Sequence, residues 1–453
     1  MLKDLTKGNP LKVLLFFALP MFLSMIFQQM YNLADSIVAG NYGGVSSLGA
    51  ISASTPVVNI FLAISIGGTL GCSVVISTLF GARDYLRMKT AVYTAIISLT
   101  IVAFICTLVG IFICRPLLEM LNTPSSLMDD ATIYLEIYIF GFFFLFIYNI
   151  ANSIFTGLGD SKTPLILLII SSVSNIFIDI LFANIFKNVV EGVAWATFIT
   201  QGIASIVSMG LLIIRIRNFK VEGKYPFFNK KILKDMIRIA IPSIIQQSIV
   251  SVGQLMVQSL INSYGVETID GYATAIKINS MAIMSINTLS SSMSSYTAQN
   301  MGVKAYDRIK KGYYAMVGLS LVLMSVIVAI VLLFNKEIIN LFLQAKEGEN
   351  LNKVIDVGKQ FLITVAPFYL TVTVKIISDG TLRGAGKMTP FMISTFVDLI
   401  VRVVFSYIFN NSLGFSAICW SFPVGWIVSA IIALTFYIIW QKKNISNKSI
   451  KML

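Results

Sequence analysis

Long apolar segments separated by short polar ones run along the whole 453-residue chain. Each apolar segment has about 20 or more residues, the length that an α-helix needs to cross the hydrocarbon core of a bilayer. Twelve of them predict twelve transmembrane helices, at residues 11–38, 51–80, 91–114, 131–156, 164–186, 191–214, 233–262, 271–298, 312–334, 357–382, 390–410 and 414–440. The pattern therefore predicts an all-α polytopic membrane protein.

Composition and charge support this prediction and orient the chain. The sequence is 56% hydrophobic and 12% charged, with a mean hydropathy of +0.83. Of its 34 Lys and Arg residues, 24 lie at the two ends or in every second predicted loop, and 5 lie in the alternate loops. Because basic residues stay on the cytoplasmic side, both termini are predicted to be cytoplasmic, in the cell membrane. The net charge of +13 therefore orients the protein and does not indicate a nucleic-acid partner.

The two halves of the sequence are copies of one pattern. Residues 19–43 align without a gap with residues 241–265, which places Pro20 on Pro242. Two later blocks follow at nearly the same shift, FGARDYLRMKTAVY on MGVKAYDRIKKGYY and GLGDSKTP on RGAGKMTP. Each half carries six spans, an even number, so the halves enter the membrane in the same sense, related by a pseudo-two-fold axis along the membrane normal.

This repeat predicts an amino-terminal lobe at 1–214, a basic cytoplasmic linker at 215–232 and a carboxy-terminal lobe at 233–453. Two six-helix lobes with a cavity between them are typical of transporters that work by alternating access. Met25 and Met256 are candidates to line an adaptable cavity, because methionine is flexible and polarizable.

Two acids inside predicted spans have no Lys or Arg within four residues, namely Asp35 and Asp179. Their counterparts in the second half are the apolar Val257 and Phe405. A charged side chain at the centre of a membrane helix costs about 2.5 to 3.5 kcal/mol on insertion scales, so such residues are usually functional. An unpaired carboxylate can exchange a proton or hold a small cation, which is what a coupling site requires.

Groups of suitable chemistry are predicted near these acids. Asn175 shares the helical face of Asp179, while Thr197 lies at a similar depth on the next helix and Tyr134 can add a phenol. The oxygens of Asp35, Asn175, Asp179 and Thr197 suit Na⁺ as well as a proton relay. The chain has no histidine, so proton coupling would rest on the carboxylates.

The second half carries charges of a different kind. Lys375 and Asp379 stand four residues apart, as do Asp398 and Arg402, so each acid lies beside a base on one helical face. These pairs are predicted to be structural ion pairs or to border a wet cavity. Lys277 has no local partner and stays a candidate for the substrate cavity.

Three motifs, in order, carry a resemblance to a known family: Gln28-Gln29-x-Tyr31-x-x-x-Asp35, Gly81-x-x-Asp84-x-x-Arg87, and Gly157-x-Gly-Asp-x-x-x-Pro164. With the six-plus-six repeat, the whole chain resembles the multidrug and toxic compound extrusion (MATE) transporters. Its acids are similar to those of the DNA-damage-inducible type, and this resemblance implies cation coupling at Asp35, Asn175, Asp179 and Thr197. It also implies lesser roles in coupling or in the substrate cavity for Gln28, Tyr134, Asn149 and Asn152.

The resemblance implies a secondary antiporter that exports amphipathic, often cationic organic compounds in exchange for protons or Na⁺. We expect no enzymatic activity and no cofactor beyond the coupling ion. We also expect the protein to be a monomer. The alternatives are a lipid-linked precursor flippase of the same superfamily and a non-transporting membrane scaffold. The Gly-x-Gly-Asp at 157–160 also matches intramembrane aspartyl proteases. The equivalent loop of the repeat, Arg383 to Lys387, carries bases and no acid, which argues against catalysis.

Overall fold

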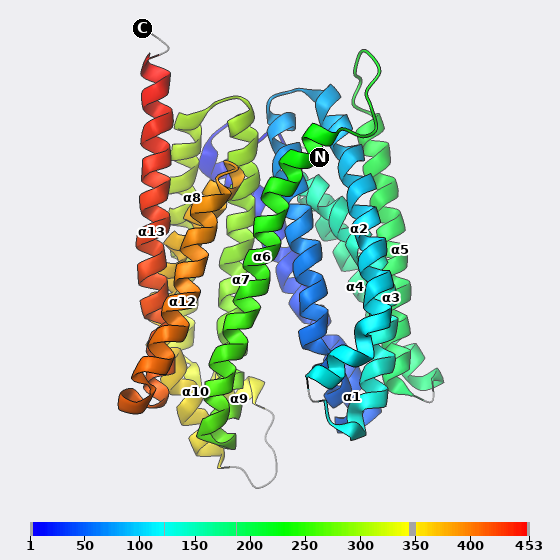
Figure 1. The fold of residues 1–453 in the computed structure, drawn as a ribbon, viewed down its shortest axis with the longest axis vertical. Helices are drawn as coiled ribbons and strands as arrows, with labels where there is room; N and C mark the ends of the chain where they lie inside the picture. Colours follow the sequence, from blue (N-terminus) through cyan, green and yellow to red (C-terminus); the bar gives the residue numbers. More distant parts are fainter. Residues whose placement is uncertain (1–2, 122, 187, 344–349, 451–453) are drawn as a thin grey trace. The chain divides into compact units, whose positions relative to one another are not determined.

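The computed structural model describes residues 3–121, 123–186, 188–343 and 350–450. Within these ranges the chain forms helices and contains no strand (Figure 1). The contacts divide it into two compact units. Unit 1 comprises the residues up to Asp4 together with Phe17–Ile244, and unit 2 comprises Leu5–Phe16 together with Ile245 onwards.

The helices of the first half are α1 (Pro10–Gly81), α2 (Tyr85–Met120), α3 (Ser125–Gly157), α4 (Lys162–Ile185), α5 (Val189–Arg217) and α6 (Lys230–Ile261). Those of the second half are α7 (Val266–Gly302), α8 (Tyr306–Leu333), α9 (Asn335–Phe342), α10 (Leu351–Val365), α11 (Tyr369–Gly384), α12 (Met388–Leu413) and α13 (Phe415–Ile450). Two short 3₁₀ turns, Asn262–Tyr264 and Ala366–Phe368, join α6 to α7 and α10 to α11.

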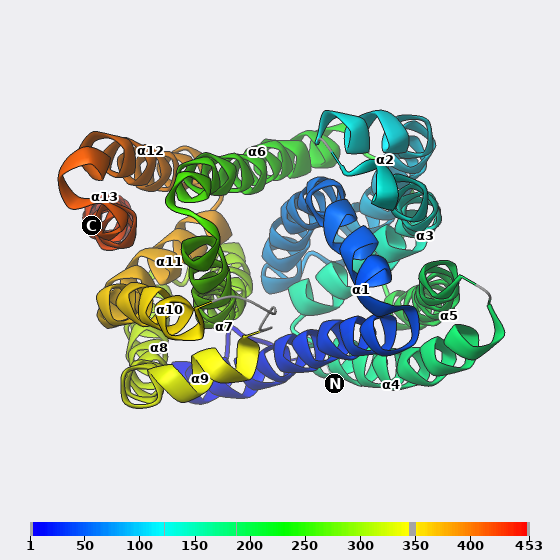
Figure 2. The ribbon, with the colours of Figure 1, turned by 90° about the horizontal axis from the view of Figure 1, so that it is seen from below.

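Eleven of the described helical segments are long and apolar enough to cross a membrane. The helix α1 supplies two of them, Pro10–Tyr42 and Gly49–Gly81, and folds back on itself between them (Figure 2). The sequence predicts a loop at 39–50, but the structure keeps these residues helical within α1, which corrects the prediction. The predicted span at 271–298 lies in the 37-residue α7, which is long enough but falls outside the eleven because its serines and other polar residues lower its hydropathy.

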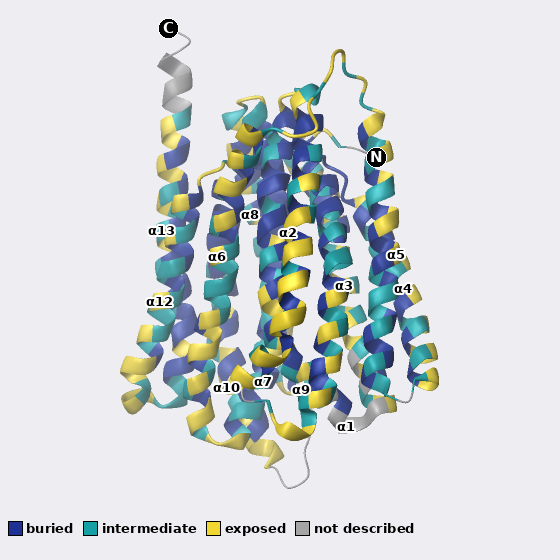
Figure 3. Cartoon of the chain, turned by 45° about the vertical axis from the view of Figure 1, so that its right-hand side comes forward, coloured by how far each residue is buried: buried dark blue, intermediate teal, exposed yellow. Residues whose placement is uncertain are grey.

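In unit 1, α3 packs against both α2 and α5, and α4 packs against α5. The rings of Phe61 on α1 and Phe142 on α3 meet edge to face at 5.2 Å in the core of this unit. The outer face of α2 is instead apolar and exposed, for example at Phe104 and Phe112 (Figure 3). Exposed apolar faces of this kind suit contact with lipid chains.

Unit 2 is built around α7, which contacts α10 and α11, while α13 packs against α11 and α12. The serines that lower the hydropathy of α7 allow close helix packing. The Ser290 hydroxyl donates to the Ile376 carbonyl of α11 at 2.7 Å, and Gly380 and Gly384 leave no room for a side chain against α7. Small residues and hydroxyl groups commonly hold helices together in membranes. The polar sequence of α7 is therefore explained by its buried position.

Both α1 and α6 pass from one unit to the other along their length. Residues up to Phe16 of α1 belong to unit 2 and the rest to unit 1, whereas α6 belongs to unit 1 up to Ile244 and then to unit 2. The changes fall close to Pro20 and Pro242, which the repeat aligns. The lobe boundaries 1–214 and 233–453 remain a prediction about the repeat, because these units group residues by packing.

The tight contact between α1 and α6 within unit 1 should be sensitive to one methyl group. A Cβ on Gly71 would meet the Met236 carbonyl oxygen and lie 2.8 Å from the Ala240 nitrogen. Because backbone atoms cannot move aside, we expect Gly71→Ala to lower the free energy of unfolding by about 1 to 3 kcal/mol. Thermal unfolding of the purified protein measures this, with Gly210→Ala as control because nothing lies within 4 Å of that position. Equal stability of the two variants would contradict the prediction.

Candidate functional site

The buried face of α4 carries the acid and the amide that the sequence singles out. Asn175 and Asp179 are four residues apart and therefore on one face, and they are 1% and 0% exposed. The opposite face presents Ile170 and Phe177 outward. The polar side chains of Asn175 and Asp179 thus point into unit 1, and apolar side chains cover the outer face of the helix.

The amide of Asn175 joins this acid to Asp35 on α1. In the orientation that hydrogen bonding selects, its nitrogen donates to Asp35 Oδ1 at 3.0 Å and to Asp179 Oδ2 at 2.8 Å. Its oxygen then accepts from the Thr200 hydroxyl of α5 at 3.2 Å. One amide therefore lies between the two carboxylates, and a second helix fixes it from the other side.

Two tyrosines complete this group. The Tyr31 hydroxyl, one turn before Asp35, hydrogen-bonds to Asp35 and to Thr197. Tyr134 of α3 is close enough to Asp35 and Asp179 to interact with both electrostatically, and its ring is 6.1 Å from that of Tyr138. The sequence predicted Thr197 as a member of this group. The structure brings Thr197 to Tyr31 and places Thr200 on the Asn175 amide.

Thr200 and Tyr31 are thus the members that sequence reasoning missed as site residues. A signal for both existed, because Thr200 is three residues after Thr197 and Tyr31 is four before Asp35, so each shares a helical face with a predicted residue. The exact rotation of α5, which decides between its two threonines, depends on packing against α3 and α4.

The chemistry of the group fits a proton or a monovalent cation. No Lys or Arg lies within ion-pair distance of Asp35 or Asp179 in the described part of the chain, and the buried Oδ1 of Asp179 has no hydrogen-bond partner there. Carboxylate, amide and hydroxyl oxygens are hard ligands that suit Na⁺, and a carboxylate with a free oxygen can also accept a proton. The residues described here contain no cluster of three His, Cys, Asp or Glu side chains of the kind that holds a divalent metal.

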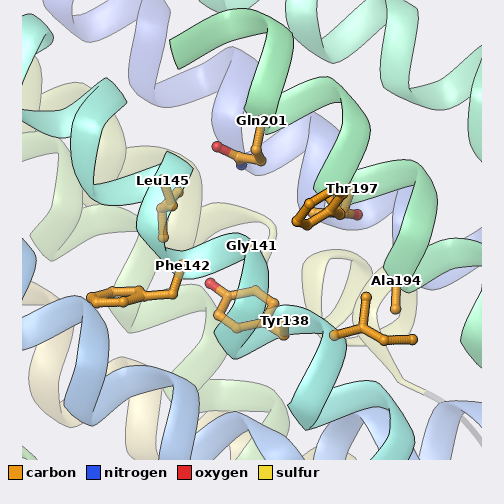
Figure 4. A pocket seen from close by; sticks show the side chains of 9 residues that line it. Tyr138, Gly141, Phe142, Leu145, Ala194, Thr197 and Gln201 are labelled. Atoms are coloured by element: carbon orange, nitrogen blue, oxygen red, sulfur yellow. The ribbon is translucent and has the colours of Figure 1, made fainter. Parts of the chain in front are cut away.

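A small cavity lies beside this group, between α3 and α5 (Figure 4). Its volume is about 20 Å³, enough for one water molecule. Its polar lining comes from Tyr138, Thr197 and Gln201. Because Thr197 lines the cavity and hydrogen-bonds to Tyr31, the hydroxyl groups of these two residues connect the cavity to Asp35.

The predicted substrate residues lie in both units. In unit 1, Met25 is half-buried and Gln28 is exposed on α1, and the Asn152 side chain is half-buried on α3. Asn149 donates to the Ser65 hydroxyl at 3.0 Å, so it joins α3 to α1.

In unit 2, Met256 is 45% exposed, and its carbonyl accepts from the Tyr407 hydroxyl at 3.2 Å. Lys277 is exposed on α7. The substrate role of the residues in either unit stays a prediction.

Unit 2 contains a buried ionic network in place of bare acids. Lys375 Nζ lies 3.2 Å from Asp379 and 3.9 Å from Asp398, and Arg402 lies 3.1 Å from Asp398. Ser394 donates to Asp379 at 2.6 Å. The geometry of the two predicted pairs is therefore confirmed, and Lys375 links them. Asp379 and Asp398 thus each have a base beside them.

The Gly-x-Gly-Asp loop has a structural explanation. Asp160 is fully buried and accepts from the backbone nitrogen and the hydroxyl of Thr163 at 3.1 and 2.8 Å, which caps the first turn of α4. It also pairs with Arg215 of α5 at 3.5 Å. This acid therefore holds α4 and α5 together, in agreement with the argument against a protease.

The fold and these charges define a polytopic helical membrane protein whose unit 1 holds two acids, Asp35 and Asp179, with no basic partner among the described residues. The sequence profile of the MatE family matches residues 20–181 and 242–408, so its two copies begin at the prolines that the repeat aligns. The chain belongs to this family, the multidrug and toxic compound extrusion transporters, which is a family of transporters and not of enzymes.

Similar proteins cover nearly the whole chain. It is 27% identical over 436 residues to the probable multidrug resistance protein YpnP of Bacillus subtilis, which is 96% of each protein. It is 26% identical over 441 residues to YoeA, another probable multidrug resistance protein of Bacillus subtilis, with 95% of this chain and 94% of that one covered. A solved structure of a MOP superfamily transporter from Pyrococcus furiosus matches the fold with a TM-score of 0.91 at 23% identity, over 97% of this chain and 98% of that one.

Proposed function

We propose that this protein is a secondary antiporter that exports amphipathic or cationic organic compounds in exchange for protons or Na⁺. The single observation that carries this proposal is the Asn175 amide, which donates to Asp35 and Asp179 together. Apolar residues would stabilise the fold better than a pair of buried acids without basic partners, so these acids have no evident structural purpose. A site that takes up and releases a cation explains them.

The position of Asp35 on α1 connects this site to movement. This helix belongs to unit 2 up to Phe16 and to unit 1 beyond, with Pro20 close to the change. Because proline removes a hydrogen bond within a helix, α1 can bend there. We infer that cation binding between Asp35 and Asp179 repositions α1 and favours release of the substrate on the outer side.

The proposal also covers the type of transporter, its oligomeric state and its orientation in the membrane. The acids in unit 1 follow the pattern of the DNA-damage-inducible type of this family, with Asp35, Asn175 and Asp179 in the coupling roles. The protein is proposed to act as a monomer in the cell membrane with both termini cytoplasmic. The flippase alternative is not favoured, because the relatives are named for multidrug resistance and the buried bases Lys375 and Arg402 are paired with acids.

Transport by the purified protein in vesicles tests the proposal. We expect an ethidium-like cation to move against its gradient when a proton or Na⁺ gradient is imposed, and to stop when the gradient collapses. Measurements at a fixed proton gradient with and without Na⁺ then identify the coupling ion. Transport that is indifferent to both gradients, or movement of lipid-linked precursors only, would refute it.

A further inference from the structure

The repeat pairs Arg308 with Arg87, and their surroundings differ. Arg308 binds a segment that we call the strap, residues 5–8, which precedes α1 and belongs in this part to unit 2. The guanidinium of Arg308 donates to the carbonyls of Leu5, Lys7 and Gly8 at 3.2, 2.7 and 2.6 Å. Arg308 is therefore occupied by acceptor oxygens of the chain itself.

Other contacts secure the strap on α7. The backbone nitrogen of Leu5 donates to Gln299 at 3.0 Å, and Asn300 donates to the Leu5 carbonyl at 3.2 Å. The Leu5 side chain is fully buried. In unit 2 the space beside Arg308 is thus filled by the strap.

In unit 1 the corresponding segment is the linker before α6, and it docks in another way. Tyr225 stacks on Tyr93 of α2 at 5.9 Å and lies under the Lys89 ammonium at 5.2 Å. The Asn229 nitrogen donates to the Thr94 hydroxyl at 3.1 Å. These contacts hold the linker along the side of α2, within unit 1.

Arg87 borders a cavity at this place. It pairs with Asp84, the cap of its own helix, at 3.8 Å, and its side chain is 61% exposed. The cavity has a volume of about 270 Å³. It is lined by Leu86, Arg87, Thr90, Pro226, Asn229 and Lys231, together with Ile232.

The lining of this cavity is suited to an anion with an apolar part. Arg87 and Lys231 provide two positive charges and Thr90 a hydroxyl, and no acid is among the lining residues. The lining residues of α2 and α6 come from the first two turns of these helices, whose amino ends carry a partial positive charge.

The linker beside the cavity has the character of a membrane interface. Phe227 and Phe228, directly before the lining residue Asn229, are 61% and 41% exposed within a basic segment. Aromatic side chains among basic residues favour the boundary between lipid chains and head groups, where anionic lipids of the cytoplasmic leaflet gather. A lipid phosphate can therefore reach Arg87 and Lys231 from the bilayer.

We propose that this cavity of unit 1 binds the phosphate head group of an anionic phospholipid between Arg87 and Lys231. The lipid supplies to Arg87 the acceptor oxygens that the strap supplies to Arg308. The inference is independent of the coupling ion and of the exported substrate.

Titration of the purified protein with phosphatidylglycerol, with the bound lipid counted by native mass spectrometry, tests the site. We expect Arg87→Gln combined with Lys231→Gln to weaken binding about tenfold or more, because each basic residue adds to the attraction for anionic lipid. Phosphatidylcholine should bind equally to the variant and the wild type, because it carries no net charge. The matched control is Lys310→Gln with Lys311→Gln, two exposed bases at the start of α8.

The controls separate a specific site from general attraction and from a soluble anion. Equal weakening in both double variants would overturn the proposal, because it would mean that only total surface charge matters. Inorganic phosphate that displaces the lipid at equal concentration would also overturn it, since a free anion would then be the ligand. A selective loss in the Arg87 and Lys231 variant that phosphate does not reproduce supports it.

Discussion

Replacing Asp35 with asparagine should reduce gradient-driven export to the rate of vesicles without protein. Asparagine keeps the size of the side chain and can still hydrogen-bond to Tyr31, but it cannot take up a proton or supply a negative charge to a cation. Asp179 would remain as a carboxylate that accepts from the Asn175 amide. We expect the variant to remain folded, because no base loses its partner.

Export should be measured as movement of a fluorescent cation driven by an imposed proton or Na⁺ gradient. The control is Asp129→Asn, the same chemical change at an exposed acid in the first turns of α3. Thermal unfolding of both variants separates loss of coupling from loss of structure. Wild-type export by the Asp35 variant would show that this acid does not couple transport.

The unpaired acids were predictable because the sequence alone shows that they lie within membrane-spanning segments, where a charged side chain costs free energy. Asp35 and Asp179 interrupt apolar segments, and the repeat shows the apolar residues that the same fold accepts in their place. The four-residue spacing then placed Asn175 beside Asp179. What the sequence does not contain is the rotation of α5, which depends on packing against two other helices. This rotation brings Thr200 to the amide and Thr197 to Tyr31.

The fold was predictable to a similar degree. The prediction failed at the ends of helices. Apolar length identified the spans, but it cannot show that α1 stays helical through 39–50, since the connection is polar and rich in glycine. The helix α9 is only 8 residues long and was not predicted. The strap was unpredictable for another reason: Leu5 is buried by contacts with α7, which is nearly 300 residues away in the sequence.

Replacing Asp398 with asparagine should destabilise the protein without changing which ion drives transport. Asp398 accepts from Arg402 at 3.1 Å and lies 3.9 Å from Lys375, and these three side chains are 9 to 12% exposed. Removing one acid leaves a buried positive charge without compensation, which costs about 3 to 5 kcal/mol of unfolding free energy. Thermal unfolding measures the loss, and transport at a low temperature reports the ion dependence.

Two comparisons decide whether the ionic network explains that loss. Asp235→Asn removes an acid from the pair with Arg238, whose side chains are more than half exposed, so its effect should be at most about 1 kcal/mol. Replacing Asp398 and Arg402 together with leucine removes the uncompensated charge and should restore much of the stability, because Lys375 keeps Asp379 at 3.2 Å. A double variant as unstable as Asp398→Asn would contradict this account. A loss of ion dependence in Asp398→Asn would instead place the network in the coupling machinery, since unit 2 would then share the task proposed for Asp35 and Asp179.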